Sequence, residues 1–217
     1  MRDAYFDQLD SIVADLVTMA REVQQQVRQA TTALLTANAE VAEQVISEDA
    51  TIDAARERIE DRSFELLALQ QPVASDLRML VAGLRMVTDL ERMGDLSVHV
   101  AKVARLRIPS FAVPDEVVPT IKRMAELAEN MVGTAAGIIA DRDVDGARHL
   151  EDDDEEMDQL RGSLFRLMLG DSWDHGVEPA VDIALLGRYY ERIADHAVSL
   201  ARRVVYLVTG ESFSATL

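Results

Sequence analysis

The sequence predicts an all-α protein of six long helices, arranged as two antiparallel three-helix bundles that are related by an internal pseudo-twofold repeat. Only 10 Gly and 5 Pro occur in 217 residues, so few positions interrupt a helix. Apolar residues recur at spacings of three and four over long stretches, which is typical of amphipathic helices. Acidic motifs also recur about 100 residues apart, which indicates a duplicated unit.

The first half of the chain divides into three expected helices. The first covers residues 4–37, and Asn38 is a plausible N-cap for a second helix that ends near residue 69. The segment Gln70-Gln71-Pro72 ends this helix, because proline cannot continue the hydrogen-bond ladder. A third helix opens at Ser75-Asp76 and runs to about Arg107.

Two prolines within residues 108–114 mark a break near the middle of the chain. We therefore expect one three-helix repeat over residues 1–108 and a second over residues 115–217. The helices of the second repeat are expected over residues 115–140, over residues 143–169 with Asp143 as the cap, and over residues 179–209. Short connections favour antiparallel neighbours within each repeat.

Composition excludes several classes of protein. The net charge of −17 argues against binding to nucleic acid or to an anionic membrane surface, because both need clustered Lys and Arg. There is no cysteine, so disulfides, thiolate metal sites and cysteine nucleophiles are ruled out. No run of about 18 apolar residues and no signal peptide is visible, so we expect a cytoplasmic protein with no direct membrane insertion.

Two pairs of acidic residues repeat in register between the halves. Glu91 and Asp95 match Glu191 and Asp195 at an offset of 100 residues. On the preceding helix of each half, the Asp-x-x-x-Asp pairs match at an offset of 105: Asp49 and Asp53, against Asp154 and Asp158. Residues four apart lie on one helix face, so each pair presents two carboxylates together.

Paired carboxylates on a partly apolar face need a neutralising partner. Glu91 and Asp95 fall within the apolar stripe of their helix, where two like charges are costly. A metal ion removes this cost, since carboxylate oxygens are natural ligands of hard cations. If neighbouring helices pair antiparallel, each half collects four carboxylates. The sequence thus predicts two sites for divalent or trivalent ions such as Mg, Zn, Mn or Fe.

Three other interpretations of the acids remain open at this stage. They could decorate a solvated face, or they could pair with Arg92 and Arg192 in ordinary salt bridges. They could also form a ferritin-like di-metal enzyme, but that class uses Glu-x-x-His, and position i+3 holds Gly94 in one repeat and Ala194 in the other. His99, one turn after Asp95, is a possible nitrogen ligand but is more simply a surface or core histidine.

The chain resembles the PhoU family, the accessory regulators of bacterial phosphate-specific transport. The resemblance rests on residues 71–78, 90–95 and 190–196, together with the two Asp-x-x-x-Asp elements and the duplicated plan. It departs from the family pattern after the motif aspartates, where Leu96 and His99 stand in one repeat and His196 and Ser199 in the other.

The resemblance implies metal sites at the Glu/Asp-x-x-x-Asp motifs and a role without catalysis. Members couple the phosphate ABC transporter, through its ATPase subunit, to a sensor histidine kinase, and they repress the phosphate-starvation response. They are cytoplasmic and often homodimeric. We accordingly expect a signalling adaptor with no catalytic residues.

Overall fold

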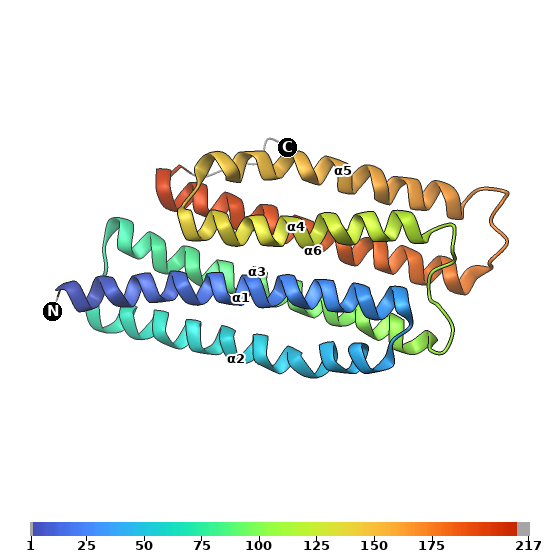
Figure 1. Ribbon diagram of the computed structural model, residues 1–217. Helices are drawn as coiled ribbons and strands as arrows, with labels where there is room; N and C mark the ends of the chain where they lie inside the picture. The colour runs from blue at the N-terminus through green and yellow to red at the C-terminus, as the bar shows by residue number, and fades with distance from the viewer. Residues whose placement is uncertain (1, 212–217) are drawn as a thin grey trace.

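Six long helices run back and forth along one direction in the computed structural model, which describes residues 2–211 apart from the side chains of residues 2–4 and 152 (Figure 1). The helices are α1 (Arg2–Thr36), α2 (Ala39–Gln70), α3 (Ala74–Arg107), α4 (Val118–Asp141), α5 (Val144–Met168) and α6 (Val177–Thr209). The described part of the chain contains no strand, so the all-α prediction is confirmed.

The predicted caps begin two of the helices. The Asn38 side chain accepts a hydrogen bond from the Val41 backbone amide at 3.1 Å, at the start of α2. The Asp143 carboxylate accepts from the amides of Asp145 and Gly146 at the start of α5. Each cap satisfies backbone donors that the helix itself cannot pair, which fixes where the helix begins.

Removing the Asn38 cap is expected to lower the free energy of unfolding by about 1 kcal/mol, because the Val41 amide loses its acceptor. Urea denaturation of Asn38→Ala, followed by circular dichroism, measures this loss. Asn38→Asp is the matched control, since aspartate caps equally well and should leave the urea midpoint near that of the parent. Equal losses in the two variants would show that the cap contributes nothing.

The connection between the halves packs into the molecule. Ala112, Val113 and Val117 are buried, so this segment adds to the core. The fourth helix begins at Val118, slightly later than the expected residue 115, because the Pro114 carbonyl accepts hydrogen bonds from the amides of Val117 and Val118 in a turn. The break near mid-chain is thus correctly predicted, but it is not a free linker.

Each half forms a bundle of three mutually packed helices, and the halves join through a shared core. In the first half α1, α2 and α3 contact one another, and α4, α5 and α6 do the same in the second. In addition α1 packs on α4, and α3 packs on α6. Four helices (α1, α3, α4 and α6) therefore form a central layer that α2 and α5 flank (Figure 1).

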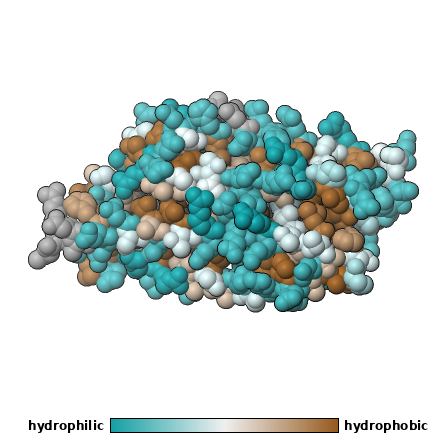
Figure 2. All heavy atoms as spheres, viewed as in Figure 1, coloured by the Kyte–Doolittle hydropathy of each residue, from teal (hydrophilic) through white to brown (hydrophobic). Residues whose placement is uncertain are grey.

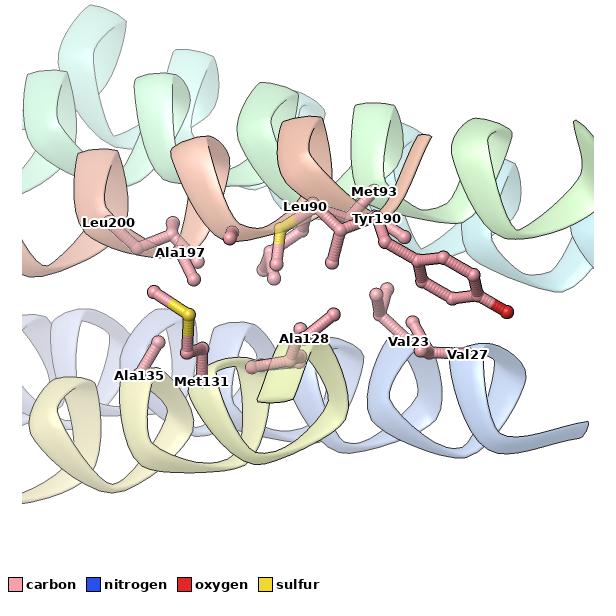
Figure 3. Close-up of a cluster of buried hydrophobic side chains, with 14 of the residues drawn as sticks. Val23, Val27, Leu90, Met93, Ala128, Met131, Ala135, Tyr190, Ala197 and Leu200 are labelled. Atoms are coloured by element: carbon pink, nitrogen blue, oxygen red, sulfur yellow. The ribbon is translucent and has the colours of Figure 1, made fainter. Parts of the chain in front are cut away.

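The central layer is filled with apolar side chains from both halves. Figure 3 shows Met131 of α4 near Ala197 and Leu200 of α6, and Val23 and Val27 of α1 near the Tyr190 ring. Met131 and Tyr190 are fully buried. The Tyr190 hydroxyl shares a hydrogen bond of 2.9 Å with the Thr31 hydroxyl, which satisfies its polar end. The hydrophobic interior is continuous across the boundary between the halves.

The outer face of α1 and α4 is mainly hydrophilic, with small apolar patches between polar side chains (Figure 2). Among the described residues, no helix is long and apolar enough to span a membrane. The long helices thus owe their burial to one another, as in other helix bundles.

Candidate functional site

The eight carboxylates that the sequence singles out lie where each flanking helix meets the central layer. We define the first acidic cluster as Asp49 and Asp53 of α2 with Glu91 and Asp95 of α3. The second acidic cluster consists of Asp154 and Asp158 of α5 with Glu191 and Asp195 of α6. Glu191 is 7% exposed. Asp53, Asp158 and Asp195 are exposed, and the remaining four are half-buried.

The carboxylates of the first acidic cluster lie near enough to repel one another. Burial, and then the negative charges of Asp95 and Asp53, raise the pKa of the Asp49 carboxyl above its ordinary value. Burial and the charge of Asp95 likewise raise the pKa of Glu91, while Arg92 and Arg56 oppose this rise. The two helices thus bring their acids together, as the antiparallel pairing predicted.

A buried amide from α1 faces the same cluster. Gln26 is 3% exposed, and its side-chain amide acts on the Asp49 carboxyl as a hydrogen-bond donor that opposes the rise in the Asp49 pKa. A Cβ added at Gly94 would lie 3.2 Å from Gln26 Oε1 and 3.8 Å from Asp49 Oδ1. Gly94 therefore permits the close approach of three helices around this amide.

Arg92 partly neutralises the first acidic cluster. Its Nη1 lies 3.0 Å from Asp95 Oδ2, and its Nε lies 3.5 Å from Glu91 Oε2. The Arg92 side chain is 59% exposed, so these contacts are surface ion pairs of small energy. An arginine held this loosely leaves the cluster open to a competing cation.

In the second acidic cluster, arginines balance the negative charge of Glu191 but leave that of Asp154 largely unbalanced. Glu191 pairs with Arg161 at 3.3 Å and with Arg188 at a shorter distance, so its charge is balanced where it is buried. Burial, followed by the charges of Asp195, Asp158 and Glu191, raises the pKa of Asp154 to about 6. The two clusters are therefore equivalent in sequence but not in how arginines balance them.

The donor set suits a hard cation, and the first acidic cluster fits it better than the second. Four carboxylates, of which Asp49 and Glu91 have a raised pKa, and a buried amide oxygen are the ligand types that such ions prefer. In the second cluster, Glu191 is already engaged by two arginines. Among the described residues, no three His, Cys, Asp or Glu side chains stand close enough as a group to coordinate one ion. Coordination by these eight residues stays a prediction.

His99 lies on an exposed part of α3 and stacks on Tyr189 of α6, with ring centroids 5.3 Å apart and planes at 22°. This contact joins the two halves and accounts for the histidine without a metal. Near the middle of the same helix pair, the buried Asp89 contacts His196 Nδ1 at 3.0 Å and Arg203 Nε at 2.7 Å.

The Asp89 group was missed from the sequence, because Asp89 lies more than 100 residues from both His196 and Arg203. The only available signal was an acid at a position of α3 that the helical pattern makes buried.

Comparison with known proteins identifies the same repeat. The family model described as the PhoU domain matches twice, over residues 16–104 and residues 121–204, once in each half. A protein of Mycobacterium tuberculosis, named phosphate-specific transport system accessory protein PhoU homolog 2, is 43% identical over 97% of this chain and 99% of its own length. A PhoU homolog of Deinococcus radiodurans is 32% identical over 97% of this chain and 99% of its own.

Solved structures of similar proteins share the whole fold. The crystal structure of the phosphate transport system regulatory protein PhoU from Streptococcus pneumoniae has a TM-score of 0.88 at 26% identity, covering 97% of this chain and 100% of the other. PhoU from Pseudomonas aeruginosa has a TM-score of 0.87 at 29% identity, covering 95% and 100%. With two domain matches, near-complete relatives and a common six-helix architecture, the chain belongs to the PhoU family.

Proposed function

We propose that this protein is a metal-binding regulator of phosphate uptake and of the phosphate-starvation response. It connects the ATPase subunit of a phosphate ABC transporter to a sensor histidine kinase and holds the response off when phosphate is plentiful. It acts in the cytoplasm as a homodimer and catalyses no reaction. The names of its relatives, which are accessory and regulatory proteins of phosphate transport, support the regulatory role.

The observation that carries the metal-binding part is the paired arrangement of the two acidic clusters. Each combines two acids from a flanking helix with two from the central layer, and in each at least one carboxyl has a raised pKa. A bound cation would relieve this repulsion and hold α2 against α3, and α5 against α6. The outer surface of the bundle would then keep one shape for docking a partner.

Adding Mg, Mn, Zn or Fe to the metal-free protein is therefore expected to raise its melting temperature and to release protons. Binding to the folded state alone stabilises it by about 2.7 kcal/mol when the free ion is at 100 times its dissociation constant. Differential scanning calorimetry in weakly buffered solution would detect both effects. Proton release is expected at weakly acidic pH, because the Asp154 carboxyl, with a pKa raised to about 6, is partly protonated there before the ion binds.

The double variant Glu91→Gln/Asp95→Asn keeps the shape of the first acidic cluster but removes its charge. It should be at least as stable as the metal-free parent and should lose much of the metal-dependent gain. The matched control is Glu57→Gln/Asp61→Asn, which removes two exposed acids at the same spacing elsewhere on α2. A gain that is unchanged in the first variant, or equally reduced in both, would contradict the site assignment.

The regulatory role has a separate test in cells. Deleting the gene should switch on phosphate-starvation genes in phosphate-rich medium, as measured by transcript levels. Affinity purification of the tagged protein from the same medium should recover the transporter ATPase subunit and a histidine kinase. Unchanged transcripts in a strain that lacks every copy of the gene would refute the negative regulation.

A further inference from the structure

A cavity of about 360 Å³ opens between α3 and α6, at the end of the molecule where α3 begins and α6 ends. Its walls carry three arginines (Arg85, Arg202 and Arg203), the hydroxyl groups of Ser199 and Tyr206, and an apolar surface that includes Val81. None of the described residues that line it is acidic. This is unexpected in a chain with 39 acidic and 22 basic residues. The volume falls in the range of small-molecule sites.

Two of the arginines are held in place by acids outside this cavity. Arg203 donates from Nε to Asp89 at 2.7 Å, and Arg202 donates from Nε to Glu151 of α5 at 2.7 Å. Contact through Nε fixes the plane of each guanidinium. The terminal amino groups of Arg203 have no hydrogen-bond partner among the residues that the structure describes. These donors are therefore positioned before any ligand arrives, which lowers the cost of binding.

The third arginine has no acid to balance it. Arg85 is exposed and makes no ion pair or hydrogen bond with any described residue. It lines both this cavity and a neighbouring depression of about 300 Å³, together with Val81 and Arg203. Three guanidinium groups with two paired carboxylates leave an excess of positive charge at this position.

The internal repeat shows that the fold does not require two of the three arginines, whereas Arg202 corresponds to the basic Lys102. At the offset of 100 residues that relates α3 to α6, Arg85 corresponds to Leu185, Arg203 to Val103, and Tyr206 to Leu106. Leu185 and Leu106 are 40% and 70% exposed at the opposite end of the same helix pair. The positions of Arg85 and Arg203 thus carry apolar side chains in the other repeat. Packing of the helices therefore does not explain why Arg85 and Arg203 stand at these positions.

From this geometry we propose that the cavity between α3 and α6 binds a phosphate group, either as free inorganic phosphate or on a small phosphorylated molecule. Guanidinium groups match phosphate oxygens through paired, charge-assisted hydrogen bonds. The Ser199 and Tyr206 hydroxyls add donors that can turn toward a bound oxygen. This site is separate from the two acidic clusters and does not depend on their binding a metal.

Isothermal titration calorimetry of the full chain tests the proposal, at constant ionic strength and with a chelator present so that metal cannot contribute. One arm titrates inorganic phosphate and the other titrates ATP. We expect saturable binding with one site per chain in at least one arm. The ligand that binds more tightly shows whether the site prefers inorganic phosphate or a phosphorylated molecule. Absence of saturable binding of both anions at millimolar concentration would overturn the proposal.

Arg85→Gln is the deciding variant, because this exposed arginine has no structural partner whose loss would unfold the protein. We expect about tenfold weaker binding or more, since a hydrogen bond to a charged group is lost. Tyr206→Phe should weaken binding by a smaller factor. The control Arg58→Gln removes the same charge from an exposed position on α2. Equal weakening in Arg85→Gln and Arg58→Gln would show general attraction of anions and would refute a site.

Discussion

Replacing Met131 with alanine is expected to lower the free energy of unfolding by about 2 to 5 kcal/mol. The side chain is fully buried, and it lies where α4 meets α6 in the central layer (Figure 3). Truncation removes apolar contacts and leaves a cavity, because other long side chains keep the two helices from closing the gap. Urea denaturation followed by far-ultraviolet circular dichroism measures the loss.

The same variant tests whether the halves unfold as one unit. Trp173, the only tryptophan, lies in the second half, so its fluorescence reports on that half while circular dichroism reports on all six helices. Because the core is continuous, the two transitions should coincide and shift together. Met79→Ala, at a half-buried position of α3, is the control and should cost less. Separate transitions would show that the halves are independent domains.

In the metal-free protein, Asp154 should contribute more stability at pH 5 than at pH 7, which is opposite to the usual behaviour of a carboxylate. The pKa of Asp154 is raised from 3.8 to about 6 in the folded state, first by burial and then by Asp195 and the rest of its cluster. Between these values the folded state binds more protons than the unfolded state. Stability therefore falls as pH rises from about 4 to 6, and the loss is complete above this range.

Asp154→Asn is accordingly expected to stabilise the metal-free protein at pH 7. The gain should be about 1 kcal/mol, because solvent screening reduces the full effect at this half-exposed position. It should vanish near pH 4, where the parent carboxyl is protonated in both states. Urea midpoints in chelator at several pH values measure it, and Glu155→Gln, at an exposed neighbouring position, should show no such trend. A variant less stable than the parent at pH 7 would contradict the proposed repulsion.

The ends of several helices could be predicted from capping and helix-breaking residues in the sequence. Asn38 and Asp143 cap helices as predicted, and the break after Gln70 coincides with the left-handed backbone of Gln71. The pairing of α1 with α4 and of α3 with α6 could not be predicted, because periodicity identifies a buried face but not the helix that covers it.

The acidic clusters could be located from sequence because four-residue spacing and repetition are visible in one dimension. Their electrostatic balance could not, since Arg161 and Arg188 reach Glu191 from positions that belong to no motif. The cavity between α3 and α6 was missed for a similar reason. Arg85 and Arg203 come from opposite halves, and each alone resembles an ordinary surface arginine.

The shared central layer bears on how such a chain could have arisen. A single half made alone would expose the apolar sides of two helices, α1 and α3 or α4 and α6, which the other half now covers. Two identical copies could cover each other in the same way, because α1 meets its own repeat counterpart α4, and α3 meets α6. The present chain thus resembles a symmetric dimer of half-length chains joined by a peptide. In one chain the two ends of the α3 and α6 pair can differ, and they do, since Arg85 and Arg203 at one end correspond to Leu185 and Val103 at the other.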